Sequence, residues 1–341
     1  MSDNMTREQM EQTFFLKTKS PAYQSALNDC RRVADSMANI LIIGASGTGK
    51  DVAARYIHAC SSRQDQPFVA VNCSSFTETL LESELFGHEQ GAFTGAVRSR
   101  AGKFEQSNHG SLFIDEVGDL SMNIQLKLLR AIETRVIERI GSNVPRKLDF
   151  RLIAATNKPL APEIAAGRFR EDFFYRISTI VIRLPNLKER REDLPDLIDF
   201  FMRASQKNNH RQIRRIEPEV RDFLMNYHYP GNIRELINIV DRMVVLSENG
   251  VITRQGLPIL YNMDREASAP APKAEFAELL PWKEFKRQSE REYLQWVLTQ
   301  TGGNASEAAR RLELSYRQLC NKILEYNLRT AKPDPEEKRR A

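Results

Sequence analysis

Short apolar runs alternate with longer amphipathic segments between residues 21 and 261. This alternation predicts an α/β fold, in which parallel strands buried on both faces are joined by helices. The runs that we expect to be strands are Ile40–Ile43, Phe68–Val71, Ser111–Ile114, Arg151–Ala155 and Ile180–Leu184.

Beyond the last of these runs the pattern becomes purely helical. Apolar residues recur at helix spacing from Leu194 onward, which predicts a helical lid on the α/β core. A stretch rich in Ala, Pro and Glu then has too few large apolar residues to pack, so we expect a linker. Helical periodicity returns after it, and the chain ends in a charged tail that we expect to be disordered. The expected segments are a short N-terminal segment at 1–20, an α/β subdomain at 21–188, the lid at 189–261, the linker at 262–281, a helical module at 282–330 and the tail at 331–341.

The length of 341 residues and the hydrophobic content of 41% are typical of a globular protein with two or three domains. No apolar run approaches the length of a membrane span and residues 1–20 are polar, so we expect a cytoplasmic protein without a membrane partner. The cysteines are scattered and indicate neither a zinc site nor a disulfide framework. The net charge of +5 permits a nucleic-acid partner without showing one.

Two glycines frame an aromatic residue in the segment Gly91-Ala92-Phe93-Thr94-Gly95-Ala96. Gly91 and Gly95 allow positive φ values, and Phe93 adds an apolar side chain that a purely structural turn does not need. These features favour a mobile loop that presses on a partner. The alternative is a β-turn whose Phe93 packs back into the core.

The first predicted strand runs directly into a glycine-rich loop, Gly44-Ala45-Ser46-Gly47-Thr48-Gly49-Lys50, and then into a predicted helix at Asp51–Ala59. This order is typical of a phosphate-binding loop, because backbone N–H groups cradle phosphates at the helix N-terminus. Lys50 would supply a charge for the β- and γ-phosphates. Asp51 stands where the general pattern has Ser or Thr for Mg²⁺. A structural glycine turn is the alternative.

The third predicted strand ends in two acidic residues, Asp115 and Glu116. This pattern is typical of a strand that holds Mg²⁺: Asp115 would bind the ion, and Glu116 would orient and deprotonate the attacking water. An acidic N-cap on the next helix explains these two residues alone, but not their pairing with the glycine loop. Together the two motifs predict a nucleotide hydrolase.

Two further pairs of polar residues are candidates for the same site. Thr156 and Asn157 follow the fourth predicted strand, at the mouth of the sheet, where a γ-phosphate or the attacking water would be sensed. Taken alone, they fit an ordinary strand exit with a turn-forming Asn. Arg170 and Arg176 lie six residues apart, and salt-bridged surface arginines are the usual explanation for such a pair.

The region from about Ser20 to Tyr261 closely resembles the AAA+ domain of bacterial enhancer-binding proteins, the activators of sigma-54 RNA polymerase. Its most specific element is the hexapeptide GAFTGA at residues 91–96, which other AAA+ ATPases lack. The resemblance implies that ATP is the nucleotide. It also implies that Phe93 and Thr94 contact the sigma factor when the loop is raised, and that hydrolysis moves the loop.

The resemblance assigns further roles to single residues. It makes Asn72 the switch that holds Glu116 according to nucleotide state. It makes Arg170 and Arg176 arginine fingers that enter the neighbouring subunit's site in a ring, which we expect to be a hexamer. It places a second sensor at Arg234, for which a surface arginine at a helix start is the alternative. The departures from the family pattern are Ala45 for Glu, Tyr229 for Trp and Ser142 for Gly.

Residues Trp282–Leu328 resemble the Fis-type helix-turn-helix domain that ends many of these activators. Two short helices joined by a tight turn would follow a longer helix, whose aromatic residues suit either dimer packing or the core of the module. The last helix would present polar side chains to the major groove of double-stranded DNA, whereas an ordinary helical hairpin is the alternative. The residues that we expect to contact DNA are Tyr316, Arg317, Gln318, Asn321 and Lys322.

About twenty residues precede the ATPase core, too few for the regulatory domain that most such activators carry. We therefore expect regulation by a separate protein or by expression level, as in activators of the phage-shock operon, whose layout is similar. The expected activity is ATP-driven remodelling of sigma-54 RNA polymerase holoenzyme from closed to open complexes, by a ring bound to upstream DNA. The alternatives are a DNA-binding regulator that keeps the AAA+ fold for oligomerisation alone, and an AAA+ machine that remodels other proteins.

Overall fold

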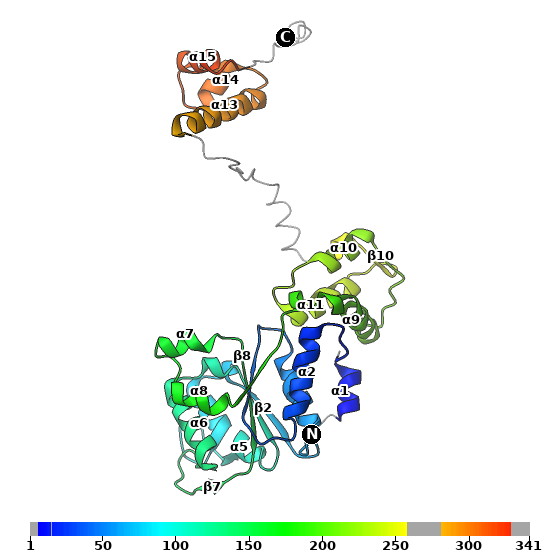
Figure 1. The fold of residues 1–341 in the computed structure, drawn as a ribbon, viewed down its shortest axis with the longest axis vertical. Helices are drawn as coiled ribbons and strands as arrows, with labels where there is room; N and C mark the ends of the chain where they lie inside the picture. Colours follow the sequence, from blue (N-terminus) through cyan, green and yellow to red (C-terminus); the bar gives the residue numbers. More distant parts are fainter. Residues whose placement is uncertain (1–5, 15, 258–280, 329–341) are drawn as a thin grey trace. The chain divides into compact units, whose positions relative to one another are not determined.

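The computed structural model describes residues 6–14, 16–257 and 281–328. The chain divides into two compact units, Met1–Glu266 and Ala267–Ala341 (Figure 1). The expected tail at 331–341 and the expected linker at 262–281, apart from Pro281, lie outside the described residues. Within the described part of the chain, no helix is both long enough and apolar enough to span a membrane.

A five-stranded parallel sheet forms the centre of the first unit, and its strands coincide with the five apolar runs of the sequence. Their order across the sheet is β2-β5-β8-β1-β9, with every neighbouring pair parallel. The predicted α/β fold with a parallel sheet is therefore confirmed. The bounds of the strands are β1 Ile40–Ile43, β2 Phe68–Asn72, β5 Ser111–Asp115, β8 Arg151–Thr156 and β9 Ile180–Arg183.

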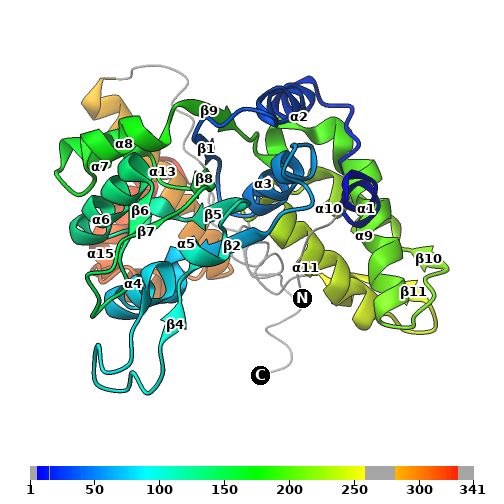
Figure 2. The ribbon, with the colours of Figure 1, turned by 90° about the horizontal axis from the view of Figure 1, so that it is seen from below.

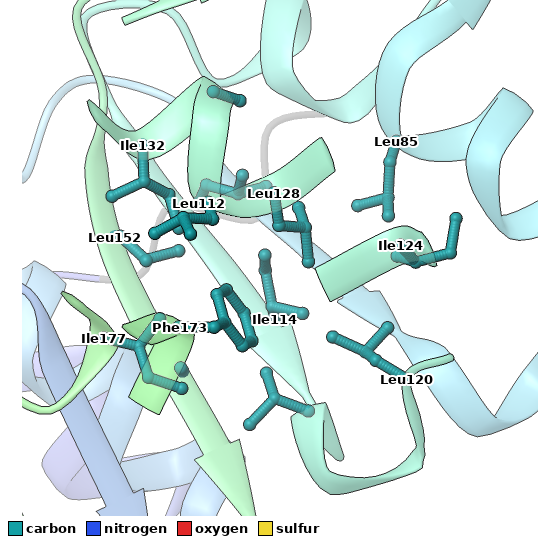
Figure 3. Close-up of a cluster of buried hydrophobic side chains, with 14 of the residues drawn as sticks. Leu85, Leu112, Ile114, Leu120, Ile124, Leu128, Ile132, Leu152, Phe173 and Ile177 are labelled. Atoms are coloured by element: carbon teal, nitrogen blue, oxygen red, sulfur yellow. The ribbon is translucent and has the colours of Figure 1, made fainter. Parts of the chain in front are cut away.

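Helices cover both faces of this sheet, because successive strand residues point to opposite sides. Ile40, Ile42 and Phe113 contribute to one buried cluster, which contains side chains from α1, α2 and α3. Leu112 and Ile114 contribute to the other, with side chains from α4, α5, α6 and α8 (Figure 3). The bounds of these helices are α1 Arg7–Thr13, α2 Pro21–Val33, α3 Lys50–Ala59, α4 Glu78–Phe86, α5 Lys103–Gln106, α6 Met122–Thr134 and α8 Glu171–Ile177.

Two small antiparallel pairs and one short helix complete the α/β region. Strand β3 (Gly87–His88) pairs with β4 (Arg100–Ala101), and β6 (Val136–Ile137) pairs with β7 (Arg146–Lys147). The loop that joins β3 to β4 carries the hexapeptide and projects from the body of the unit (Figure 2). The short helix α7 spans Leu160–Ala165.

The helical region after β9 has a hydrophobic core of its own. Helices α9 and α11 pack against each other, and apolar side chains from α9, α10 and α11 form a buried cluster. Pro195 lies in the first turn of α9 and Pro218 at the start of α10, where a missing N–H costs nothing. The elements are α9 Leu194–Asn208, β10 Arg215–Ile216, α10 Pro218–Asn226, α11 Asn232–Val245 and β11 Val251–Ile252.

Three helices make up the described part of the second unit: α13 (Trp282–Gln300), α14 (Ala305–Arg311) and α15 (Tyr316–Glu325). The side chain of Asn304 caps α14, and Ser315 forms a capping box with Gln318 at the start of α15. Small side chains on α14 and Leu319 on α15 are buried in one cluster with side chains of α13.

Candidate active site

The glycine-rich loop connects the carboxyl end of β1 to the N-terminus of α3. Gly47 and Gly49 have φ values of +76° and +93°, which L side chains rarely adopt. Lys50 is the first residue of α3 and is buried, with its Nζ donating to the carbonyl oxygen of Gly44 at 3.2 Å. The loop therefore has the backbone shape and the placed ammonium group that phosphate binding requires.

Asp115 and Glu116 lie beside this loop, at the carboxyl end of β5. The Nζ of Lys50 is 3.4 Å from Oε1 of Glu116. Burial raises the pKa of Asp115 above its ordinary value, the charge of Glu116 raises it further, and Lys50 opposes both effects. A partly buried carboxylate next to other carboxylates is poorly compensated, which is the electrostatic setting that a divalent cation improves.

The two predicted sensor residues, at the end of β8 and directly after it, make different contacts in this structure. The backbone N–H of Asn157 donates to Oε2 of Glu116 at 3.0 Å. Thr156 is fully buried, and its hydroxyl accepts a hydrogen bond from the backbone N–H of Lys158 at 3.1 Å. Glu116 is thus held by Lys50 on one side and by the backbone after β8 on the other.

Asn72 contacts Asp115 rather than Glu116 in this structure. Its Nδ2 lies 3.5 Å from Oδ2 of Asp115, and its Oδ1 accepts hydrogen bonds from the backbone N–H and the hydroxyl of Ser74. Strand register explains the contact, since Asn72 and Asp115 are direct partners across β2 and β5.

The lid supplies the opposite wall. Arg234, in the first turn of α11, donates from one terminal nitrogen to Oγ of Ser46 at 2.9 Å. Backbone contact is just as close, because the N–H of Ile233 donates to the carbonyl oxygen of Gly47 at 2.9 Å. The predicted second sensor therefore touches the glycine-rich loop directly.

A cavity of about 380 Å³ lies between these parts. Its lining combines the glycine-rich loop, Asp115 and Glu116 with a group of mainly apolar side chains. The apolar part of the lining was not anticipated from the sequence. Its side chains include Phe14, Tyr23, Leu197, Phe201 and Ile237.

Arg190, which also lines the cavity, belongs to a buried polar cluster that the sequence did not reveal. Its guanidinium lies over the ring of Tyr23, 3.7 Å from the centroid, and its Nε donates to Oδ2 of Asp193 at 3.0 Å. The fully buried Asp193 also accepts from the hydroxyl of Thr18 and the backbone N–H of Lys19, both at 2.6 Å. The N-terminal segment is therefore tied to the start of the lid.

The two candidate arginine fingers lie outside this cavity. Arg170 is paired with Asp172 at 2.6 Å, next to the start of α8, and the exposed Arg176 reaches the carbonyl oxygen of Ile132 at 3.4 Å. Neither residue lines the cavity of its own chain.

The hexapeptide forms the tip of the β3–β4 loop. Gly91 and Gly95 have φ values of +82° and +103°, as expected, and a Cβ on either would meet nothing. Phe93 is 40% exposed and packs edge-on against His88, with ring centroids 5.0 Å apart. It therefore rests on the base of the loop and is not part of the core.

A second loop, between β6 and β7, braces the base of this one. The N–H of Ile140 donates to the carbonyl oxygen of Gly87, and the N–H of Glu89 donates to that of Ile140. The guanidinium of Arg139 forms ion pairs with Oε1 of Glu89 at 3.1 Å and with Oε1 of Glu105 at 2.7 Å. Its hydrogen bond to Glu105 lowers the pKa of that carboxyl. Backbone hydrogen bonds and ion pairs thereby join the two loops.

The candidate DNA-contacting side chains differ in their exposure and in their partners within the unit. Tyr316, Arg317 and Asn321 are exposed on α15. The Oε1 of Gln318 accepts hydrogen bonds from the N–H and hydroxyl of Ser315, so part of this side chain caps the helix. Lys322 is paired with Glu290 of α13 at 3.1 Å, which neutralises its charge within the unit.

On α13, only some of the aromatic and apolar candidates enter the core. Val297 is buried among the core side chains, whereas Tyr293 and Trp296 are 56% and 58% exposed. The rings of these two residues stack with centroids 6.0 Å apart. The helix thus carries an exposed aromatic surface besides its buried face.

Three family descriptions match the chain in succession: the Sigma-54 interaction domain at residues 16–183, the AAA+ ATPase lid domain at 188–274, and the Fis family of bacterial regulatory proteins at 286–326. The transcriptional regulatory protein ZraR of Salmonella typhimurium is 45% identical to the chain over 304 residues, which are 89% of this chain and 67% of ZraR. The chain belongs to the sigma-54-dependent transcription activators. It combines the AAA+ ATPase domain of that family with a Fis-type helix-turn-helix, so the predicted family and fold are confirmed.

Another sigma-54-dependent activator and a solved structure are also similar to the chain. The regulatory protein AtoC of Escherichia coli is 42% identical over 316 residues, covering 91% of this chain and 67% of AtoC. The crystal structure of NtrX from Brucella abortus in complex with ADP is similar, with a TM-score of 0.67 and 33% identity, over 94% of this chain and 71% of NtrX.

Proposed function

We propose that this activator binds and hydrolyses ATP in the cavity between its core and lid, and uses the reaction to remodel closed sigma-54 promoter complexes into open ones. The observation that carries the proposal is the meeting of Lys50, Glu116 and Arg234 around one cavity. NtrX, similar over most of the chain, has been solved with ADP and with ATP, which supports the choice of nucleotide.

The phosphates of ATP would lie against the glycine-rich loop, and its adenine ring would lie against the apolar side chains that line the cavity. Lys50 would exchange its contact with Glu116 for the β- and γ-phosphates, which frees the carboxylate. Glu116 would then accept the proton of the attacking water as the water oxygen bonds to the γ-phosphorus, while the bond from that phosphorus to the β–γ bridging oxygen breaks and ADP leaves. Arg234 would bind the phosphates from the lid side and hold the lid closed.

The residues around Asp115 fit a magnesium ion. Mg²⁺ prefers oxygen ligands, and the raised pKa of Asp115, to which the nearby charges of Glu116 and Asp51 contribute, indicates an excess of negative charge at this carboxylate. Asp115 would hold the ion directly or through water. When bound, Mg²⁺ offsets the negative charge that develops on the transferred phosphoryl group.

A closed ring would complete the site. Arg170 and Arg176 lie away from the cavity of their own chain, which supports their assignment as arginine fingers for a neighbouring subunit. Both would offset charge on the phosphoryl group, so that hydrolysis depends on assembly, as a hexamer in this family. Asn72 would exchange its contact with Asp115 for one with Glu116 in another nucleotide state.

The hexapeptide would deliver the output. Phe93 and Thr94 are exposed in the β3–β4 loop, which projects from the unit, and we propose that they contact sigma-54 when the loop is raised. The brace through Arg139 would carry movement of the core to this tip. The C-terminal unit would hold the ring on upstream DNA, with Tyr293 and Trp296 available for pairing two copies, and a separate protein would regulate the activity.

The deciding experiment measures sigma-54-dependent open-complex formation in vitro with ATP. Wild type is compared with Thr94→Ala, Thr94→Ser and Glu116→Gln, and ATP turnover is recorded in parallel. We expect Thr94→Ala to lose open complexes while it still hydrolyses ATP, Thr94→Ser to retain part of them, and Glu116→Gln to lose both activities. Full activity of Thr94→Ala would refute the assigned role of the loop, and normal turnover by Glu116→Gln would refute the assigned base.

A further inference from the structure

Asn232 joins otherwise separate parts of the first unit through its side-chain amide. Its Nδ2 donates to the carbonyl oxygen of Ser46 at 2.9 Å. Its Oδ1 accepts the backbone N–H of Leu187 at 2.8 Å, and its own N–H donates to the carbonyl oxygen of Tyr229 at 2.8 Å. The side chain is 3% exposed, so these bonds form away from water.

The contact with Leu187 lies in the connecting segment, which we define as residues 184–193 between β9 and α9. This segment is the covalent passage from the α/β core to the lid. Asn232 therefore links the first turn of α11 to the connecting segment and to the glycine-rich loop at the same time.

Geometry suits this position to asparagine. The φ value of Asn232 is +53°, a left-handed conformation that Asn tolerates better than most residues. Its side-chain amide accepts through Oδ1 from Leu187 and donates through Nδ2 to Ser46, so both kinds of hydrogen-bonding group are used. An aspartate would keep the acceptor and lose the donor, whereas a glycine would keep the backbone and lose both.

The contact with Ser46 bears on phosphate binding through the peptide plane. In a trans peptide the C=O and the following N–H point in opposite directions. A hydrogen bond that holds the carbonyl oxygen of Ser46 therefore fixes the direction of the N–H of Gly47, and the bond from Ile233 to the carbonyl oxygen of Gly47 fixes the next peptide in the same way.

The glycine-rich loop packs tightly against the backbone at the start of the lid helix α11. A Cβ built on Gly47 would lie 2.2 Å from the carbonyl oxygen of Gly231, so the loop and the lid backbone are in direct contact. The glycine-rich loop cannot change the direction of its peptides without disturbing the start of α11.

We propose that Asn232 is a positioning residue that couples the connecting segment, and with it the lid, to the phosphate-binding peptides of the glycine-rich loop. The proposal rests on nucleotide binding in the cavity. Asn232 touches no nucleotide itself, and acts through the Ser46–Gly47 peptide. Nucleotide that orders this peptide would strengthen both side-chain bonds and so restrain the connecting segment.

Hydrogen exchange, read by mass spectrometry on the full chain, tests the coupling. Peptides that cover the glycine-rich loop and the connecting segment are followed with and without the non-hydrolysable ATP analogue AMP-PNP and Mg²⁺. The variants are Asn232→Gly, Asn232→Asp and the control Asn249→Gly. Asn249 is an exposed lid residue with a φ of +51°, so its replacement repeats the backbone change away from the cavity.

In wild type and in Asn249→Gly, AMP-PNP is expected to slow exchange in both peptides. At saturating AMP-PNP, Asn232→Gly should still protect the glycine-rich loop but no longer slow the connecting segment. Its KM for ATP should rise about tenfold, the equivalent of one buried hydrogen bond. Asn232→Asp, which keeps the bond to Leu187, should show the same loss of coupling and serves if the glycine variant does not fold.

Two results would overturn the proposal. The first is a normal response of the connecting segment in both Asn232 variants. The second is faster hydrogen exchange in the connecting segment of the Asn232 variants that is already present without AMP-PNP, together with an unchanged KM for ATP. This result would indicate a purely structural role. Failure of wild type to bind AMP-PNP would contradict the proposed function instead, so the two failures are distinguishable.

Discussion

The ammonium group of Lys50 is paired with the carboxylate of Glu116, with Nζ 3.4 Å from Oε1. Both side chains are mostly shielded from water, so the pair is stronger than an ion pair on the surface. On the proposed function, phosphate and Glu116 would compete for the same cation, and binding of nucleotide would release the carboxylate.

This competition predicts opposite effects of Glu116→Gln on binding and on turnover. Removal of the carboxylate frees Lys50 for phosphate, so the affinity for ATP should rise. Loss of the base should lower kcat by a factor on the order of 10² to 10⁴. Isothermal titration with ATP and a phosphate-release assay give the two values. Glu133→Gln, at an exposed position on α6, is the control, and weaker ATP binding by Glu116→Gln would contradict the competition.

Gly47→Ala should weaken nucleotide binding much more than a backbone effect alone explains. Its Cβ would collide with the carbonyl oxygen of Gly231 at 2.2 Å, and its φ of +76° adds strain. Gly167→Ala is the matched control, because its φ is +69° and its Cβ would meet nothing. Titration with ADP should show at least about a fivefold loss for Gly47→Ala alone, since displacement of a packed backbone costs more than about 1 kcal/mol. Equal affinities of the two variants would refute the collision.

Stability should fall on the acid side because of a buried histidine. His58 lies between Ser111 and Gln66, and burial lowers its pKa from 6.5 to about 4. The unfolded chain therefore binds a proton that the folded chain excludes, so this contribution is complete above pH 6.5 and is lost as the pH falls towards 4. It amounts to about 3 kcal/mol at most.

Urea unfolding followed by circular dichroism across this pH range checks the effect of His58. His58→Gln should flatten the acid limb of the curve, whereas His210→Gln, at an exposed position in the lid, should leave its shape unchanged. If the free energy of unfolding of His58→Gln fell as steeply at acid pH as that of wild type, the pH dependence would belong to other groups.

DNA binding should depend more on Arg317 than on Lys322. Arg317 is exposed, whereas the charge of Lys322 is already paired with Glu290. In anisotropy titrations with a non-specific duplex, Arg317→Ala should reduce the salt slope by about one, as expected for one lost phosphate contact. Lys322→Ala should change it by much less. A larger effect of Lys322→Ala would mean that the ion pair opens on DNA.

Local patterns are sufficient to predict the central part of this protein. The five strands and the glycine-rich loop are read from neighbouring residues, and parallel strands bring Lys50, Asp115 and Glu116 to one edge of the sheet. These features are predictable because periodicity and strand order are properties of the chain itself.

What the sequence does not reveal depends on contacts between distant segments. Tyr23 and Arg190 meet at the cavity across more than 160 residues, and the pairing of Lys322 with Glu290 requires the packing of α13 on α15. The contact of Asn72 with Asp115 follows from register, which a single sequence does not specify. Side chains of this kind carry no local periodic signal, because tertiary packing alone determines their partners.

The docking of α11 on the glycine-rich loop has a consequence for synthesis of the chain. The carbonyl oxygens of Ser46 and Gly47 receive their hydrogen bonds from Asn232 and Ile233, which the ribosome adds almost two hundred residues later. A nascent chain that has already formed its sheet still lacks these donors. The nucleotide site is therefore finished only once the start of α11 has left the ribosome, so a growing chain acquires its complete site late in translation.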